Sequence, residues 1–320
     1  MKKNKTELKI AALTTGLLAA AVGTGLTLIK VFTDMAIDKD IPKVANNAKS
    51  KVNGAIIGDD AYQKGKELSR ALRTREHLKV HITNRSGLSL AGHVYEAKKQ
   101  KRIVIAMHGW RSTWSFDFGG SADFFLDEGC TLILTEQRSH GTSEGEAIGF
   151  GVLERYDCLD WINYAKEKYP NTPIYLLGIS MGATTVLMTS GLELPSEVKG
   201  VIADCGFTSP HAIWSHVIKK NTKISGELAY PVANYFINKK AGYSGDEAST
   251  IDAVQNAKVP ILFVHGDEDN FVPMSMTMEN YNACKAPKML LIVKGASHGM
   301  SYFVDTPAYQ QHVRELFKND

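Results

Sequence analysis

Residues 174–185 read IYLLGISMGATT, and this stretch decides the fold of the chain. Its first four residues form an apolar run of strand length, and the preceding PNTP (170–173) is a turn signal. The GISMG that follows (178–182) fits the pattern G-x-S-x-G with Ser180 at its centre, and a helix can continue behind it. A sharp turn from strand to helix projects its central side chain above a sheet. It needs flanking glycines because a β-carbon there would collide with neighbouring backbone. Short glycine–serine motifs also occur by chance, so the partners of Ser180 decide what the motif means.

The stretch belongs to a series of short apolar runs that alternate with helical patterns. Continuous apolar residues indicate strands covered on both faces, which is typical of a parallel sheet flanked by helices. Two alternating segments on either side of NRSG (84–87) predict an antiparallel hairpin before the first of these runs. We therefore expect an α/β fold with a doubly wound, mostly parallel sheet. The predicted buried strands are Ile103–Met107, Thr131–Leu134, Ile174–Leu177, Val201–Ala203, Ile261–Val264 and Met289–Val293.

Residues 204–260 interrupt this alternation, because a single crossover helix needs far fewer residues. The segment is rich in aromatic residues and lysines, and we interpret about 206–256 as a small helical cap over the strand ends. Aromatic side chains are common in binding pockets. The alternative is an elaborated crossover whose aromatic residues form only its own small core. The candidate substrate-pocket residues are Phe207, Trp214, Tyr235 and, outside the cap, Tyr302.

The N-terminal segment carries a different kind of signal. Residues 10–29 contain no charge and are long enough to cross a bilayer as a helix at about 1.5 Å per residue. Four lysines precede them and no positive excess follows, so the positive-inside rule puts the N-terminus in the cytoplasm. We predict that residues 1–33 are a signal anchor with a transmembrane helix. The protein would then be a single-pass protein of the cell membrane, with its folded domain outside the cell.

The alternative to an anchor is a cleaved signal peptide, with the AAA at 19–21 as the cleavage site and a secreted mature chain. Cleavage there would leave the apolar VGTGLTLIKVF at the new N-terminus, so the uncleaved anchor is favoured. Residues 34–76 are polar with scattered alanines, and AYQKGKELSRALRTREH within them has a helical pattern. The sequence leaves open whether this helix is a stalk or packs on the domain that follows, at about 77–320.

Composition bears on the classes of partner. The net charge is +3, but residues 1–33 carry +4, so the rest of the chain is close to neutral. Such a body lacks the clustered basic surface that nucleic acid requires. The four cysteines are widely spaced without a C-x-x-C pair, and the histidines do not cluster at metal-ligand spacing. We therefore expect no metal, no cofactor and no dependence on disulfides. The expected partners are a small-molecule substrate and the membrane.

A serine hydroxyl needs partners to act as a nucleophile: a base that takes its proton, a carboxylate that orients the base, and donors for the oxyanion. In a strand–turn–helix architecture the chain order is serine, then acid, then histidine, each at the C-terminal end of a strand. HGDEDNFVP (265–273) and KGASHGM (294–300) follow the last two predicted strands. They supply Asp269 and His298 as the partners of Ser180, so these three residues are the predicted catalytic triad.

The remaining polar residues near these strand ends are assigned other roles. Asp267 directly follows HG and is interpreted as shaping the tight turn. It is the second candidate, after Asp269, for the acid of the triad. His265 and His108 each precede a glycine at a strand end and are interpreted as structural, since one base suffices. The predicted oxyanion hole consists of two backbone N–H groups. One belongs to Met181, after the nucleophile, and the other to Trp110, in the loop after the first buried strand.

Five motifs stand in the order of a known family. They are HGW, TEQRSHGTSEG (135–145), GISMG, HGDEDNFVP and SHG, and together they resemble the α/β-hydrolase superfamily over about residues 77–320. Within it the chain is similar to membrane-anchored bacterial hydrolases of the serine aminopeptidase and bile-acid acyltransferase-like branch. The family's loop usually reads D-x-R-G-H-G. Here Glu136 and Ser139 replace the aspartate and the first glycine, which leaves the triad intact. The resemblance implies the α/β-hydrolase fold and a hydrolase activity.

The expected chemistry is the transfer of an acyl group to water through an acyl-enzyme on Ser180. An aromatic cap favours an apolar acyl or aryl group, so a carboxylesterase acting on small esters is the first hypothesis, with thioesters and amides as related substrates. An aminopeptidase or short-peptide hydrolase is the second and an acyltransferase the third. A non-catalytic surface binding module stands outside these enzyme classes, but such a module has no need of a triad. The acidic candidates for binding the amino terminus of a peptide are Glu227, Asp246, Glu247 and Asp252.

Overall fold

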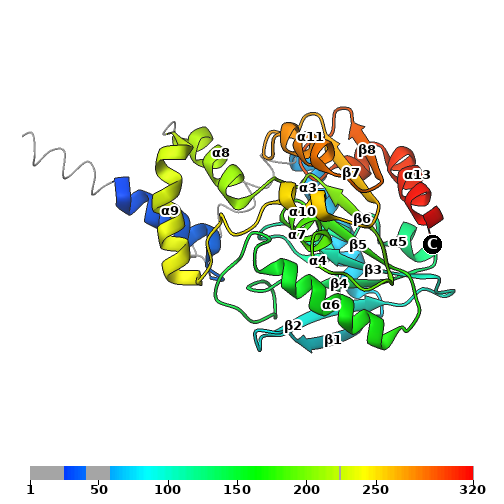
Figure 1. Ribbon diagram of the computed structural model, residues 1–320. Coiled ribbons are helices and arrows are strands. Elements are labelled where there is room, and N and C mark those ends of the chain that lie inside the picture. Colours follow the sequence, from blue (N-terminus) through cyan, green and yellow to red (C-terminus); the bar gives the residue numbers. More distant parts are fainter. Residues whose placement is uncertain (1–24, 41–57, 223–224, 320) are drawn as a thin grey trace, which may run out of the picture.

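An eight-stranded sheet runs through the part of the chain that the computed structural model describes, residues 25–40, 58–222 and 225–319 (Figure 1). Its strand order is β1-β2-β4-β3-β5-β6-β7-β8. Strand β2 pairs antiparallel with β1 and β4, and all other neighbours are parallel. The predicted mostly parallel sheet is thereby confirmed. The strands are β1 (Leu78–Thr83), β2 (Ser89–Tyr95), β3 (Arg102–Met107), β4 (Cys130–Thr135), β5 (Ile174–Ile179), β6 (Val198–Asp204), β7 (Ile261–Gly266) and β8 (Lys288–Val293).

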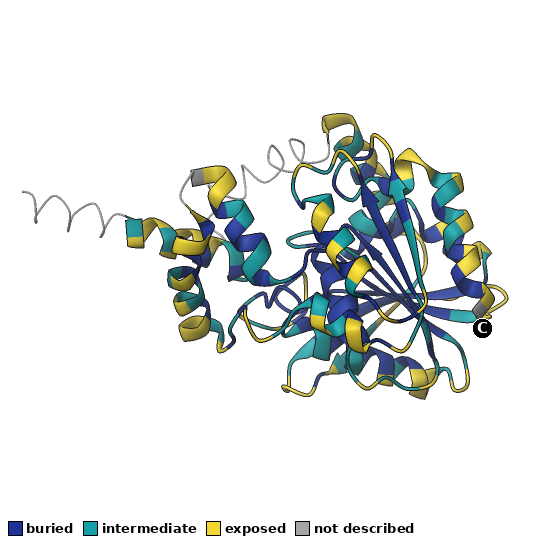
Figure 2. Ribbon diagram, turned by 45° about the horizontal axis from the view of Figure 1, so that its top comes forward, coloured by how far each residue is buried: buried dark blue, intermediate teal, exposed yellow. Residues whose placement is uncertain are grey.

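Helices cover both faces of the sheet, and alternate side chains of each central strand enter different cores. In β3, Val104 and Ala106 belong to one buried cluster, whereas Ile103 and Ile105 belong to another. Figure 2 shows the central strands buried along their length. Both faces exclude water, which explains the continuous apolar runs. The helices are α3 (Asp59–Thr74), α4 (Trp114–Phe118), α5 (Ala122–Asp127), α6 (Glu154–Lys168), α7 (Met181–Ser190), α8 (Pro210–Thr222), α9 (Gly226–Ala241), α10 (Thr250–Asn256), α11 (Met274–Ala283), α12 (Ser301–Val304) and α13 (Thr306–Leu316).

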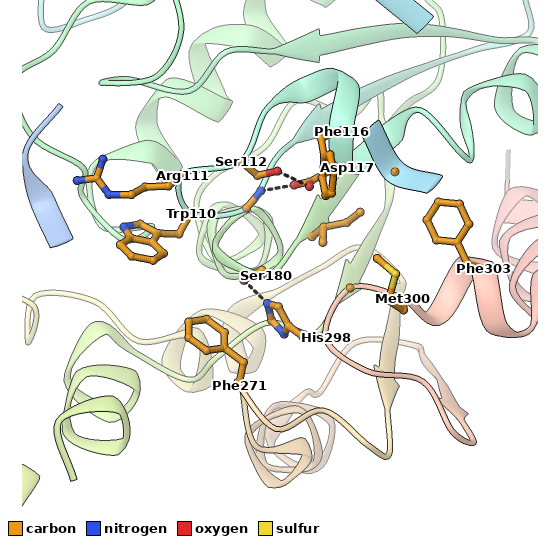
Figure 3. Close-up of a pocket in the computed structure, with 14 residues that line it drawn as sticks. Trp110, Arg111, Ser112, Phe116, Asp117, Ser180, Phe271, His298, Met300 and Phe303 are labelled. Carbon is orange, nitrogen blue, oxygen red and sulfur yellow. Dashed lines mark hydrogen bonds between the residues drawn. The ribbon is translucent and has the colours of Figure 1, made fainter. Parts of the chain in front are cut away.

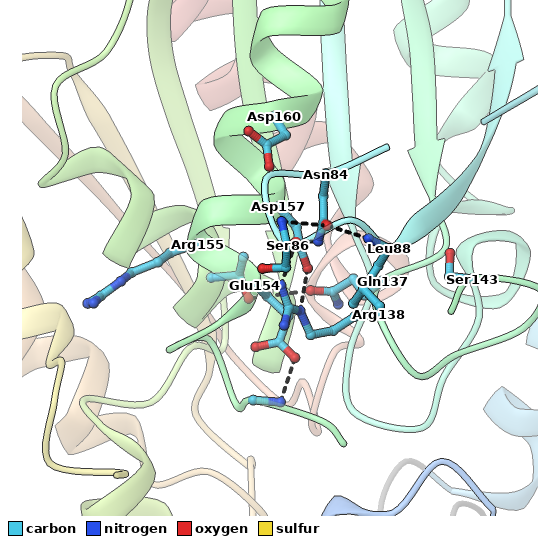
Figure 4. A network of polar contacts seen from close by, with 12 residues as sticks. Asn84, Ser86, Leu88, Gln137, Arg138, Ser143, Glu154, Arg155, Asp157 and Asp160 are labelled. Carbon is cyan, nitrogen blue, oxygen red and sulfur yellow. Dashed lines mark hydrogen bonds and ion pairs between the residues drawn. The ribbon is translucent and has the colours of Figure 1, made fainter. Parts of the chain in front are cut away.

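A buried ion pair connects the loop after β4 to helix α6 (Figure 4). Arg138 donates from Nε and Nη2 to the two carboxylate oxygens of Asp157, each over 2.6 Å. Asn84, at the turn between β1 and β2, donates to the same carboxylate over 2.6 Å. Three segments that are distant in the sequence are therefore fixed to one another. The loop after β4 is held in this way beside the ends of the neighbouring parallel strands.

Helices α8 and α9 stand away from the sheet, on the side where residues 25–40 also lie (Figure 1). Ile37, Trp214 and Ile237 belong to a third apolar cluster, which joins the N-terminal helix, α8 and α9. Helix α10 instead contributes Val254 to a cluster formed with the sheet. The segment predicted as a cap, about 206–256, therefore divides into two helices that stand apart and one helix, α10, that packs against α7 and α11 beside the sheet.

The predicted transmembrane helix lies largely outside the described residues. Residues 1–24, with the alternative cleavage site at 19–21, are not described, and residues 25–37 are helical. Within the described ranges no helix has the length and apolar composition needed to span a bilayer.

Helix α3 packs on the main body of the protein. An added β-carbon at Gly65 would lie only 2.9 Å from the ring of Phe116 in α4, so the two helices are in close contact. The hydroxyl of Tyr95 in β2 donates to the carbonyl of Leu72 over 2.8 Å. These contacts correspond to the second of the two alternatives for this segment, a packing helix rather than a stalk.

Candidate active site

Ser180 lies at the sharp turn between β5 and α7. Its backbone has φ 56° and ψ −118°, a conformation that residues other than glycine rarely adopt. A β-carbon at Gly178 would lie 2.2 Å from the carbonyl oxygen of Gly182, and one at Gly182 would lie 1.8 Å from that of Met107. Both glycines of the G-x-S-x-G motif are therefore required by close backbone approach. The Ser180 N–H donates to the carbonyl of Asp204 over 2.8 Å, which fixes the strained residue to the end of β6.

Loops after β5, β7 and β8 bring Ser180, Asp269 and His298 together, although 118 residues separate the serine from the histidine. His298 Nε2 lies 2.9 Å from Ser180 Oγ, and His298 Nδ1 lies 2.7 Å from Asp269 Oδ2. Figure 3 shows the imidazole directed at the serine, with the ring of Phe271 beside it. The Phe271 and His298 ring centres are 5.0 Å apart in an edge-on arrangement. All three polar side chains are largely shielded from water.

Asp269 has more hydrogen-bond partners than His298 has. Its Oδ1 accepts the backbone N–H groups of Phe271 and Val272 over 2.8 and 2.9 Å. Its Oδ2 contacts two histidines. It bonds to His298 and also lies 3.2 Å from Nε2 of the fully buried His265. Burial alone would raise the pKa of Asp269, but the charge of His298 and the hydrogen bonds from both histidines hold it well below its usual range. The carboxylate is therefore ionised throughout the neutral range.

Two residues of this loop were assigned structural roles from the sequence, and their positions differ. Asp267 is exposed and accepts the Gly295 N–H over 2.6 Å, so it joins the loop after β7 to the loop after β8. His265 contacts Asp269 directly, and its Nδ1 lies 2.7 Å from Thr277 Oγ1. Sequence reasoning missed this link to the acid, although the i, i+4 spacing within HGDED offered a signal.

The loop after β3 contains the first candidate oxyanion donor. The N–H of Gly109 donates to Asp117 Oδ2 over 2.6 Å, and the N–H of Arg111 donates to His140 Nε2 over 3.0 Å. Between them, the N–H of Trp110 has no acceptor within the described ranges of the chain. Of these three consecutive N–H groups, Trp110 is therefore the one that remains available to an oxyanion.

The second candidate donor is Met181, the first residue of α7. The first N–H groups of a helix have no acceptor within the helix, so this N–H is also available, at the positive end of the helix dipole. The two predicted oxyanion donors therefore lie just beyond the ends of β3 and β5, which are neighbours in the sheet.

Asp117 in α4 is a partly buried acid beside the triad that the sequence analysis did not identify. It accepts from the Gly109 N–H and from the Ser112 hydroxyl, and it thereby fixes both ends of the loop around Trp110 (Figure 3). Burial raises the pKa of Asp117, against the opposing effect of these hydrogen bonds and of His108. No short motif surrounds this residue, so the sequence offered no signal for it.

Two cavities meet at Ser180. The small cavity has a volume of about 100 Å³ and includes Asp117, Ser112, His298 and Phe303 among its lining residues. The large cavity has a volume of about 500 Å³ and a mainly apolar lining. Its walls include Phe32, Ala36, Phe150, Phe207, Trp214 and Val217.

The predicted pocket residues divide into two pairs. Phe207 and Trp214 line the large cavity. Tyr235 and Tyr302 line neither cavity, and their assignment is corrected. Tyr235 lies on the outer side of α9 with 60% of its surface exposed. Tyr302 packs on the core around Tyr309 and accepts a hydrogen bond from Gln310 over 3.0 Å. The next residue along α12, Phe303, lines the small cavity.

Cys205, Asp269 and His298 form a group that could be considered as metal ligands, since their ligand atoms lie within 4.8 Å of one another. Burial, with the charges of Asp204 and Asp269, raises the pKa of the Cys205 thiol well above its usual value. A protonated thiol is a poor ligand. His298 and Asp269 are already joined to each other over 2.7 Å. The group therefore fits a hydrogen-bonded triad better than a metal site.

Two family models match the chain in adjoining segments. The model described as alpha/beta hydrolase fold matches residues 102–223, and the model of the Dienelactone hydrolase family matches residues 224–315. The chain belongs to the α/β-hydrolase superfamily. The resemblance inferred from five sequence motifs is confirmed at this level.

Two curated relatives resemble parts of this chain at low sequence identity. The protein YqkD of Bacillus subtilis (strain 168) is 28% identical over 196 residues, which cover 61% of this chain and 64% of YqkD. Lysophosphatidylserine lipase ABHD12 of Xenopus tropicalis is 21% identical over 229 residues, 68% of this chain and 58% of the lipase. The chain thus spans less than two thirds of the length of these relatives. Among solved structures, the esterase Pf2001 of Pyrococcus furiosus shares the fold, with a TM-score of 0.62 and 23% identity over 79% of this chain and 94% of the esterase.

Proposed function

We propose that this protein is a serine hydrolase that cleaves carboxylic esters. Ser180 is the nucleophile, His298 the general base and acid, and Asp269 the group that orients the imidazole. The observation that carries the proposal is the hydrogen-bonded chain from the Ser180 hydroxyl through His298 to Asp269. This chain meets the requirement for an activated serine, in which the base reaches the nucleophile and a third group orients the base.

The reaction has two half-reactions. Ser180 Oγ attacks the ester carbonyl while His298 Nε2 accepts the hydroxyl proton, and the Trp110 and Met181 N–H groups donate to the oxyanion. His298 then gives its proton to the oxygen of the leaving alcohol, and the acyl group stays on Ser180. In the second half-reaction His298 takes a proton from water, whose oxygen attacks the acyl-enzyme. The carboxylic acid leaves as Ser180 regains its proton.

An ester substrate is better supported than a peptide. The apolar lining of the large cavity suits an acyl group without charge. A peptidase that binds a free amino terminus would need an available carboxylate, and both oxygens of Asp117 already accept hydrogen bonds from Gly109 and Ser112. The other acidic candidates, none of which lines either cavity, are Glu227, Asp246, Glu247 and Asp252.

Labelling with a fluorophosphonate probe tests this function, because the probe reacts with an activated serine. The full-length protein should be labelled at Ser180, and Ser180→Ala should not be labelled. Ser86→Ala is a matched control, since Ser86 is exposed in the turn between β1 and β2, and it should be labelled like the wild type. Undiminished labelling of Ser180→Ala, or no labelling of the wild type, would reject the proposal.

We also propose that residues 10–29 anchor the protein in the cell membrane with the domain outside. The support for this is their uncharged length and the four lysines that precede them. Alkaline extraction of membranes, followed by protease treatment of intact cells, tests the arrangement. Recovery of the full-length chain in the soluble fraction would contradict it, and a shortened chain in the medium would favour signal cleavage.

A further inference from the structure

The two cavities at Ser180 differ in their relation to His298. The His298 imidazole lines the small cavity and does not line the large one. Under the proposed ester hydrolysis, His298 must deliver a proton to the alcohol oxygen as it leaves. The alcohol part of the substrate therefore belongs in the small cavity, and the acyl part belongs in the large cavity on the other side of Ser180.

The cavities also differ in size. The large cavity, at about 500 Å³, has walls of aromatic and aliphatic side chains, and its polar residues include Lys220 and Asn270. The small cavity, at about 100 Å³, is also mainly apolar, with Phe116, Met300 and Phe303 lining it beside Asp117 and Ser112. A long apolar acyl chain joined to a short alcohol matches this pair of cavities.

One wall of the large cavity comes from residues 25–37, the helix that precedes the catalytic domain. Phe32 and Ala36 lie four residues apart, on one face of this helix, and both line the cavity. Val31 also lies on the helix, but 49% of its surface is exposed and it does not line the cavity. The helix therefore presents a lining face and an outer face that mutation can compare.

The end of this helix is fixed to the active-site loop. The Trp110 indole donates to the carbonyl of Ala36 over 2.9 Å, and Arg111 Nη2 lies 2.7 Å from the carbonyl oxygen of Met35. Ile37 is completely buried, and Lys240 of α9 pairs with Asp34 over 3.1 Å. The wall is thus held from both the catalytic domain and the helices that stand apart from the sheet.

We propose that the large cavity binds the fatty acyl chain of an ester with a small alcohol, and that Phe32 and Ala36 determine how long a chain is accepted. This inference rests on the proposed esterase function and assigns its substrate class. The N-terminal helix is then part of the binding site for the acyl chain. Its two lining residues are specificity determinants that no catalytic motif contains.

The test is a chain-length series on the full-length protein. The substrates are 2-hydroxyethyl esters of butanoic, hexanoic, octanoic and decanoic acid, each kept below its critical micelle concentration, with acid release followed by titration. For the wild type, kcat/KM should rise with chain length by up to about fourfold per methylene, the value that follows from burying one methylene group. The measured quantity is the ratio of kcat/KM for the decanoyl ester to that for the butanoyl ester.

Two variants should lower this ratio, for different reasons. Ala36→Phe fills the cavity and should lower the ratio at least tenfold. Phe32→Ala removes a contact with the chain and should lower the ratio about three- to tenfold, and Phe32→Leu should restore most of it. Val31→Ala is the matched control on the outer face and should leave the ratio unchanged.

A wild-type ratio near one, or equal ratios for the wild type, Ala36→Phe and Phe32→Ala, would overturn this inference. Those outcomes leave ester hydrolysis itself intact. A wild type that cleaves none of the four esters and resists the fluorophosphonate probe would instead reject the proposed function, and the inference with it.

Discussion

The indole N–H of Trp110 donates to the main-chain carbonyl of Ala36 over 2.9 Å, across 74 residues of sequence. The proposed oxyanion loop is therefore joined to the end of the N-terminal helix. Arg111 strengthens the connection, since its Nη2 also lies 2.6 Å from the carbonyl oxygen of Asp38. The position of a proposed catalytic N–H thus depends partly on a segment outside the sheet.

Trp110→Phe tests what this bond contributes. The variant keeps the backbone N–H and most of the apolar surface but leaves the Ala36 carbonyl without its indole donor. We expect a loss of about 1 kcal/mol in the free energy of unfolding and a three- to tenfold lower kcat for ester hydrolysis. Urea denaturation and steady-state kinetics measure the two effects. A loss of activity as large as that of Ser180→Ala would contradict the assignment of the catalytic role to the backbone N–H.

Asp117→Asn should impair the transition state more than substrate binding. Asp117 accepts from Gly109 and Ser112 and so positions the loop that carries the Trp110 N–H. Oxyanion donors act when charge develops, so we expect kcat to fall roughly 10- to 100-fold while KM changes little. Asp160→Asn, which removes the partner of Arg85 on another part of the surface, is the control. An unchanged kcat, or an effect confined to KM, would show that Asp117 does not position this loop.

Glu136 should stabilise the fold at neutral pH. Burial alone would raise the pKa of Glu136, but hydrogen bonds from His93 and Thr142 outweigh it and lower the pKa to about 2. Because the pKa of Glu136 is lower in the folded state, its ionised form stabilises the fold above pH 4.5, the ordinary pKa of a glutamate. This stabilisation is lost as the pH falls toward 2. Glu136→Gln should therefore lower the free energy of unfolding by about 2 kcal/mol at pH 7, and by less at pH 3.5. Urea titrations at both pH values measure this, and a difference that does not shrink with acidity would argue against the ionised pair.

Asp204 should have the opposite effect on stability. Burial raises the pKa of Asp204 to about 6, although the charge of His265 and the Ser301 hydrogen bond oppose the shift. The folded state then holds a proton that the unfolded state releases, so this group's contribution is complete below about pH 4 and is lost as the pH rises through 6. Asp204→Asn, which resembles the protonated acid, should gain about 2 kcal/mol relative to the wild type between pH 4 and pH 7.5. Equal pH profiles for the two proteins would contradict the raised pKa.

The sheet could be predicted from the sequence because burial on both faces leaves a simple pattern. The run Ile174–Leu177 corresponds to β5, Ile174–Ile179, and the other predicted runs also lie within observed strands. The grouping of Ser180, Asp269 and His298 could be anticipated for a related reason. Parallel strands end at one edge of the sheet, so polar residues that directly follow them come together there.

Other features depend on tertiary contacts that no local pattern encodes. Tyr302 and Phe303 are neighbours in α12, and only the packing of this short helix decides that Phe303 lines the small cavity. Phe32 fell within the predicted anchor, residues 1–33, and Ala36 within the polar segment 34–76, so neither was predicted to line a cavity. Asp117 is an isolated acid in the sequence, and its role depends on a loop eight residues earlier folding back onto it.

The central claim is that Ser180 becomes acylated during turnover. Mass spectrometry of the acid-quenched full-length protein, mixed with an excess of a short-chain p-nitrophenyl ester, tests it most directly. We predict one acyl adduct on the peptide that contains Ser180, a burst of nitrophenol equal to the number of sites, and a fall in kcat of roughly 10³-fold or more in Ser180→Ala. An adduct on another residue, or full turnover by Ser180→Ala, would contradict the account.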